Sequence, residues 1–170
     1  MLFDANAPNN TIKSRPRKIV QPLIVGLGAL TMSAESARQL SAAFSEASER
    51  CLTERPCGDE TLAIVLVPGI VCAALSIELG FKAMIMEDGK IAKGHNLLKL
   101  FHRLGPWSQN AIVHSVGLDR KSFENELAEM SEAFVQWRYV YEYDEVKISI
   151  GFLDKLLRAT VSAASNERRA

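Results

Sequence analysis

The chain has 170 residues, 48% of them hydrophobic and 24% charged, which is the length and balance of one folded domain. This hydrophobic content excludes a chain that is disordered throughout. Twenty Lys and Arg residues are opposed by 20 Asp and Glu residues, so the formal net charge is zero. A protein that coats nucleic acid or membrane through its overall charge is therefore excluded, whereas a local basic patch is not.

The cysteines and the apolar segments favour a cytoplasmic protein without a membrane span. Three cysteines cannot all pair within the chain, and no Cys-x-x-Cys or Cys/His spacing typical of zinc sites occurs. The uncharged segment 61–77 is interrupted by Pro68 and is shorter than the ~20 apolar residues of a spanning helix. Residues 1–10 are polar and acidic, unlike a signal peptide. We expect a buried core helix, no membrane contact, no metal and no cofactor.

Three regions are predicted along the chain. Residues 1–22 carry Asn and Pro without any period and are expected to form a mobile arm. Its basic run at 13–18 (KSRPRK) is interpreted either as a solvated tail or as a phosphate contact. A single helical domain is expected over 23–165, followed by a frayed tail at 166–170.

The first two helices are predicted from capping residues and apolar spacing. A helix is expected from Ser33 to Leu52, with Ser33 as its N-cap. Its apolar residues recur every three or four positions and predict the buried stripe, namely Ala37, Leu40, Phe44, Ala47 and Cys51. A turn over 54–60 ends it, because Pro and Gly interrupt helices. A short helical piece at 60–66 and a long helix at 68–87, which Asp88 and Gly89 end, are expected next.

The second half of the sequence also predicts helices only. Short helices are expected over 97–104 and 109–116. Asp119 is expected to cap a longer helix that reaches residue 141, because apolar residues are spaced there by alternating fours and threes: Phe123, Leu127, Met130, Phe134, Trp137 and Tyr141. A last helix is expected over 145–165. No strand of convincing alternation occurs, so the fold class is predicted to be all-α, a bundle of four to five helices.

Two groups of polar residues within the helical pattern are candidates for a site. Glu78 and Lys82 stand one turn apart and can pair, either as a solvated pair on the helix edge or as part of a functional site. His95 and Asn96 follow at the entrance of the next helix. His95 has the side chain whose free pKa lies nearest neutrality, as acid–base chemistry requires, although a structural role is the alternative.

The second group lies in the FVQWRYVYE segment at 134–142. Arg138, Tyr139 and Glu142 are offset from the apolar stripe of that helix. Beside aromatic residues, Arg138 is suited to binding phosphate or bases. Alternatively, it forms a buried ion pair with Glu78 that holds two helices in register.

These segments resemble HEPN domains. The run SIELGFKAMIMEDGKIAKGHNLLKLFHRL at 76–104 is similar to the family's signature stretch, in which a helix with Glu-Leu-x-x-Lys-Ala precedes a Gly-His-[Asp/Asn]-Leu that opens the next helix. The later FVQWRYVYE is similar to the C-terminal helix of some HEPN subfamilies. The resemblance covers residues 60–160 and implies an all-α bundle that is usually dimeric through its long helices.

The resemblance also implies a choice of functions. Many HEPN relatives are metal-independent ribonucleases in toxin–antitoxin, abortive-infection and RNA-processing systems, and others are non-catalytic or bind nucleotides. The catalytic relatives carry Arg-x4–6-His, but here positions 143–145 hold Tyr143, Asp144 and Glu145, and all three histidines precede Arg138. The standard ribonuclease motif is therefore missing.

Three hypotheses follow. The first is a non-catalytic HEPN-like homodimer that binds RNA, a nucleotide or a partner protein, in a defence or toxin–antitoxin context. The second is a metal-independent ribonuclease with an atypical site composed of Arg138, Tyr139, His95, Glu78 and Lys82. The third is a helical structural subunit without a ligand.

Overall fold

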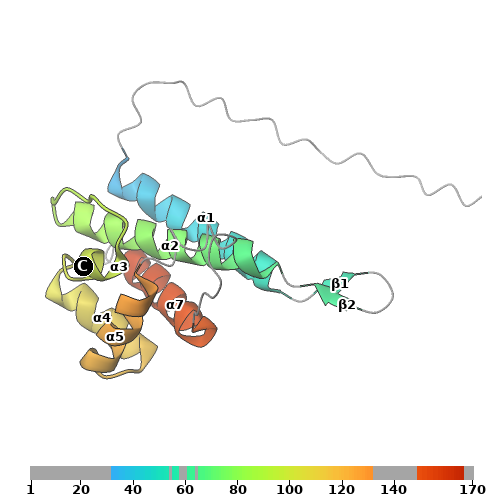
Figure 1. Ribbon diagram of the computed structural model, residues 1–170. Helices are drawn as coiled ribbons and strands as arrows, with labels where there is room; N and C mark the ends of the chain where they lie inside the picture. The colour runs from blue at the N-terminus through green and yellow to red at the C-terminus, as the bar shows by residue number, and fades with distance from the viewer. Residues whose placement is uncertain (1–31, 54, 58–60, 64, 132–148, 167–170) are drawn as a thin grey trace, which may run out of the picture. The chain divides into compact units, whose positions relative to one another are not determined.

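The computed structural model describes residues 32–53, 55–57, 61–63, 65–131 and 149–166. All of them belong to one compact unit, Thr31–Ala170. The described helices are α1 (Ala34–Leu52), α2 (Leu66–Glu87), α3 (Leu97–Phe101), α4 (Pro106–Val116), α5 (Arg120–Met130) and α7 (Ile150–Asn166). The all-α class is confirmed, and Figure 1 shows α1 and α2 side by side, with α7 packed on α2. The predicted arm at 1–22 and residues 167–170 lie outside the described part.

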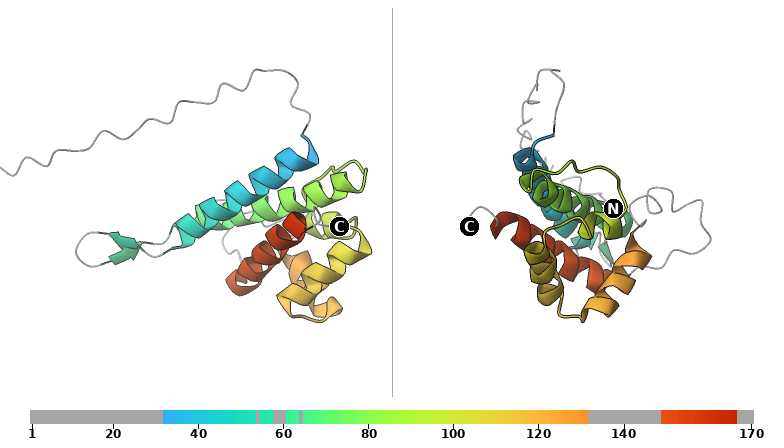
Figure 2. Two further views of the ribbon diagram at one scale, coloured as in Figure 1. Left: turned by 180° about the vertical axis from the view of Figure 1, so that it is seen from behind. Right: turned by 90° about the vertical axis from the view of Figure 1, so that its left-hand side faces the viewer.

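The turn between α1 and α2 differs from its prediction. Residues Arg55–Cys57 (β1) and Thr61–Ala63 (β2) form a two-stranded antiparallel hairpin, which projects beyond the ends of both helices (Figure 2). The short helical piece expected at 60–66 is therefore wrong, and α2 begins directly at Leu66. Three-residue strands are too short to produce a recognisable alternation in the sequence.

The face that α1 buries agrees only in part with the predicted apolar stripe, because Ala37 is buried and Phe44, Ala47 and Cys51 are half-buried, but Leu40 is exposed. Ser33 caps the helix as expected, since its side chain accepts a hydrogen bond from the Ser36 N–H. The fully buried residues of α1 are Ala37, Ser41 and Ser48, whereas Leu40 is 41% exposed. Serine is buried here because its hydroxyl donates to a carbonyl of α2: Ser48 Oγ to the Gly69 oxygen and Ser41 Oγ to the Ser76 oxygen, both at 2.8 Å.

Helix α2 is the central element of the domain. It is buried on most sides, as predicted for the apolar run that begins before Pro68. By length and composition alone it is apolar enough to cross a membrane, but 72% of its most apolar window is buried within the protein. Asp88 and Gly89 end it as expected, with Gly89 in the left-handed region at φ 71°.

Four phenylalanines from four helices connect the core. The ring of Phe101 lies 6.0 Å from that of Phe81 and 4.9 Å from that of Phe123, and Phe123 lies 5.7 Å from Phe152. These separations are typical of aromatic pairs in cores. Asp119 caps α5 as predicted, and the expected core residues Phe123, Leu127 and Met130 are buried. The part of this predicted helix beyond residue 131, with Phe134, Trp137 and Tyr141, lies outside the described residues.

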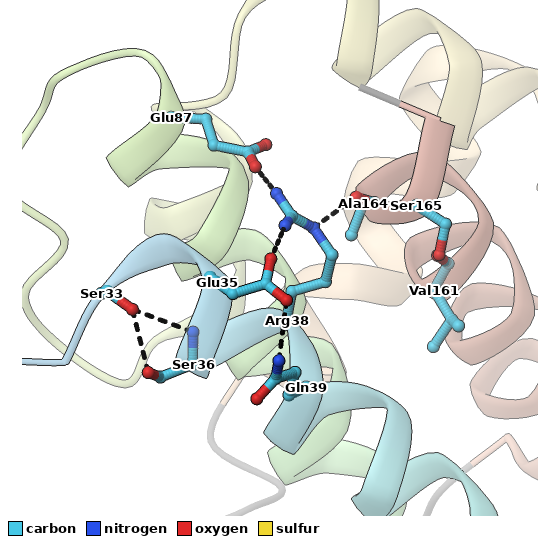
Figure 3. Close-up of polar contacts among 9 residues, drawn as sticks. All are labelled: Ser33, Glu35, Ser36, Arg38, Gln39, Glu87, Val161, Ala164 and Ser165. Atoms are coloured by element: carbon cyan, nitrogen blue, oxygen red, sulfur yellow. Dashed lines mark hydrogen bonds and ion pairs between the residues drawn. The ribbon is translucent and has the colours of Figure 1, made fainter. Parts of the chain in front are cut away.

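Arg38 ties three helices together on the side of α1 that faces α7 (Figure 3). Its guanidinium donates to Glu35 of α1 and to the Ala164 oxygen of α7, and it forms an ion pair with Glu87 of α2. The Arg38 side chain is only 11% exposed. Because a guanidinium carries five donors in a fixed plane, one residue can serve all three helices.

Candidate functional site

Two of the predicted site residues, Lys82 and His95, contact the buried carboxylate of a third, Glu78. Glu78 lies on α2 with 3% of its side chain exposed, and its Oε1 accepts a hydrogen bond from Lys82 Nζ at 2.7 Å. The Nδ1 atom of His95 lies 3.0 Å from the same oxygen and 3.2 Å from Oε2. The solvated-edge interpretation of the Glu78–Lys82 pair is therefore wrong for Glu78. A buried carboxylate needs such partners, because desolvation disfavours an unpaired charge.

The connection between α2 and α3 carries His95 to this carboxylate. Gly89 and Gly94 both have positive φ, at 71° and 94°, where a side chain would be strained. The Arg103 guanidinium donates to the backbone oxygens of Ile91 and Lys93, so it supports the middle of the connection. His95 emerges with 64% of its side chain exposed and one ring nitrogen at Glu78. The exposed imidazole is thus positioned by a buried acid.

Asn96, the candidate next to His95, has a structural role in the part of the chain that is described. Its side-chain oxygen accepts a hydrogen bond from the Lys99 N–H at 2.9 Å, which makes it the N-cap of α3. The remaining candidates, Arg138, Tyr139 and Glu142, lie outside the described residues. The proposed Arg138–Glu78 ion pair stays a prediction, and the partners described for Glu78 are Lys82 and His95.

The stretch of chain that contains His95 is rich in basic residues, although no motif indicates it. From residue 89 to residue 118 the sequence has no Asp or Glu, yet this stretch contains four cationic residues and every histidine of the chain: Lys90, Lys93, Lys99, Arg103, His95, His102 and His114. The side chains of Lys90, Lys93 and Lys99 are exposed. The sequence signal for this basic stretch is the run without acids. The net charge of the whole chain is zero and gives no sign of it.

The two most exposed large hydrophobic side chains of the described part also occur in this stretch. Ile91 is 71% exposed and Trp107, at the start of α4, is 60% exposed. Other bulky apolar residues that reach the surface are 40–50% exposed. We name the exposed side chains of Lys90, Ile91, Lys93, His95, Lys99 and Trp107 the basic strip. Cationic side chains and an exposed aromatic ring within one stretch are the combination that single-stranded nucleic acids bind.

The described residues of this site are suited to binding and to proton transfer. A carboxylate that holds one nitrogen of an imidazole sets the orientation of the ring, as in hydrolases that use histidine as a base. Among the residues that the structure describes, no three His, Cys, Asp or Glu side chains gather as metal ligands would. A groove of about 430 Å³ lies elsewhere, between α1, α2 and α7, and contains none of these candidates.

Comparisons of the chain with models of protein families, with curated proteins and with solved structures find no match.

Proposed function

We propose that this chain is a HEPN-like helical module that binds RNA without cutting it, as a homodimer, in a defence or toxin–antitoxin context. The observation that carries the proposal is the run without acids at 89–118, in which three lysines and His95 are exposed and His95 contacts the buried Glu78. In a chain of zero net charge, such a local patch gives a directed attraction for a polyanion.

The cluster at Glu78 supports a fixed rather than a fluctuating site. Lys82 and His95 both contact one carboxylate that has 3% of its side chain exposed. A cation that is already held in place loses less side-chain entropy when a phosphate arrives. The missing histidine after Arg138 is the reason to propose binding without cleavage, since the resemblance places the ribose-phosphate chemistry on that pair.

Binding is tested by fluorescence anisotropy with a labelled single-stranded RNA in EDTA. The double variant Lys93→Glu/Lys99→Glu should weaken binding about tenfold and lower the salt dependence, because each lost phosphate contact reduces counterion release. The control is Lys121→Glu/Lys155→Glu, which makes the same charge change at exposed positions of α5 and α7. Equal losses for both variants, or no binding by the wild type, would refute the proposal.

The second candidate function is a metal-independent ribonuclease. It is favoured by one observation, the contact of His95 Nδ1 with Glu78, because an oriented imidazole is what a general base requires. Incubation of labelled total RNA with the protein in EDTA separates the two candidates. Cleavage by the wild type that His95→Ala or Arg138→Ala abolishes would establish the enzyme. Intact RNA with all three proteins, together with anisotropy binding, agrees with the binding module.

The homodimer is tested separately by light scattering at micromolar concentration. A monomer with and without RNA would contradict that part of the proposal. Capture of a cognate protein that competes with RNA would instead assign the basic strip to a protein partner.

A further inference from the structure

We infer that Trp107 is a stacking platform for an unpaired base of the RNA strand that the basic strip binds. The inference rests on the proposed RNA binding and specifies its form, namely single-stranded RNA held by its bases as well as by its phosphates. The first observation is exposure. Trp107 is 60% exposed, so its side chain contributes little to the core. The next residue of the helix, Ser108, is buried, so Trp107 lies beside the face of α4 that packs on the domain.

The second observation is that Trp107 has a fixed position on the backbone. Gly105 is the N-cap of α4, Pro106 is its first residue and Trp107 follows within the first turn. Proline at this position fixes φ and favours the start of a helix. The helix is anchored below this turn, because the side-chain nitrogen of Gln109 donates to the Leu104 oxygen at 2.9 Å. An aromatic ring on a rigid backbone loses little entropy on stacking.

The third observation places the lysine-bearing connection against the same turn. A Cβ on Gly105 would lie 3.5 Å from the Asp88 carboxylate, so the residues before Trp107 abut the end of α2. Lys90 Nζ forms an ion pair with Asp88 at 2.9 Å and lies 3.4 Å from the Arg103 oxygen, and the Arg103 side chain donates to the oxygens of Ile91 and Lys93. The segments 90–93 and 103–107 are therefore neighbours. Lys93 and Trp107 thus lie on segments that adjoin in the fold as well as in the sequence.

This combination selects a single strand over a duplex. Bases in a duplex are stacked on each other and do not offer a face to a protein side chain, whereas unpaired bases stack on aromatic rings. Every base has such a face, so we expect weak dependence on sequence and strong dependence on salt. A protein partner that docked through the apolar side chains of Trp107 and Ile91 would instead bind with little dependence on salt, because apolar contacts are not screened.

The test uses three polyanions: oligouridylate, a blunt-ended RNA duplex without unpaired bases, and inorganic polyphosphate. Trp107→Ala should weaken oligouridylate binding about tenfold, Trp107→Phe should retain most of the affinity, and binding of polyphosphate should change little. Leu40→Ala is the matched control, since it removes another exposed apolar side chain, at 41% exposure on α1. Circular dichroism of each variant checks the fold.

Fluorescence gives a readout that a structural role would not change. The chain has two tryptophans, so Trp137→Phe leaves Trp107 as the only indole. Oligouridylate should quench its emission and polyphosphate should not. If the wild type binds oligouridylate but Trp107→Ala binds equally well, the stacking inference is wrong and the proposed function stands. If the wild type binds none of the three polyanions, both are wrong.

Discussion

Ser41 on α1 and Ser76 on α2 exchange hydrogen bonds with each other's backbone. Ser41 Oγ donates to the Ser76 oxygen at 2.8 Å, and Ser76 Oγ donates to the Ser41 oxygen at 2.6 Å. Ser41 is 1% exposed and Ser76 is 0% exposed. Each buried hydroxyl thereby finds its hydrogen-bond acceptor on the opposite helix, and the pair fixes the register of α1 on α2.

We predict that Ser41→Ala and Ser76→Ala each lower the free energy of unfolding by about 1 kcal/mol, because each removes one buried hydrogen bond whose acceptor carbonyl stays bonded within its own helix. Urea denaturation of both single variants and the double variant measures this. The losses should not be additive, since the two hydroxyls also lie 3.3 Å apart. Ser162→Ala, at an exposed position of α7, is the control. Losses no larger than that of the control would contradict the prediction.

A second prediction concerns Gly80, where three helices meet. A Cβ there would lie 2.6 Å from Thr160 Cγ2 of α7 and 3.1 Å from Ser41 Oγ of α1. Gly80→Ala should therefore destabilise the fold by about 1–3 kcal/mol, although alanine is favoured over glycine in a helix. Thermal unfolding followed by circular dichroism measures the change.

The same substitution at Gly151 is the matched control, because a Cβ there meets nothing within 4 Å. Gly151→Ala should be neutral or stabilising. Adding Thr160→Ser to Gly80→Ala removes the clashing methyl group and should recover part of the loss. If the Gly80 and Gly151 variants unfold at the same temperature, the close packing of α1, α2 and α7 described above is incorrect.

The sequence predicted the local features of the fold and missed those that depend on tertiary contact. Helix caps at Ser33 and Asp119 are local, because the side chain bonds an N–H two or three residues away. The buried face of α1 is not local. Apolar spacing correctly included Ala37 but also assigned Leu40 to this face, whereas Ser41 and Ser48 are buried there because carbonyls of α2 are within reach. Hydrophobicity alone gives no such information.

The candidate site likewise has one local feature that the sequence predicted and tertiary features that it did not. The spacing of Glu78 and Lys82 predicted their contact, since residues four apart are neighbours on a helix. The burial of Glu78 and its contact with His95 depend on how the connection between α2 and α3 folds back, which spacing does not encode. Trp107 was missed because it lies between the two helices predicted at 97–104 and 109–116, and neither its place in the first turn of α4 nor its exposure follows from apolar spacing.

The third prediction concerns pH. The pKa of Asp119 lies below its ordinary value of 3.8, mainly because the Ser122 side chain and then the Ser122 N–H donate to its carboxylate. A group with a lowered pKa in the folded state stabilises the fold above its unfolded pKa, and this stabilisation is lost as pH falls through the folded pKa. Asp119→Ala should therefore lower the melting temperature at pH 7, and the difference from wild type should shrink below pH 3.8. A difference that is constant with pH would contradict this assignment.

The last prediction concerns Glu78 and distinguishes its two partners. Glu78→Gln keeps the size of the side chain but removes the charge that holds Lys82, whose side chain is only 15% exposed. Loss of one partner of a buried pair is costly because the other charge stays desolvated, so we expect a loss of about 1–3 kcal/mol in urea denaturation. His95→Ala should cost much less, because its side chain is 64% exposed and exposed pairs contribute at most about 1 kcal/mol. Adding Lys82→Met to Glu78→Gln should recover stability, since it removes the unpaired cation.

Hydrogen exchange gives an independent measurement of the same two contacts. Both Glu78→Gln and His95→Ala should speed exchange in the connection at 88–96, but only Glu78→Gln should speed exchange in α2. If the two variants destabilise the protein equally, the carboxylate acts through His95, and the Lys82 contact contributes nothing to stability.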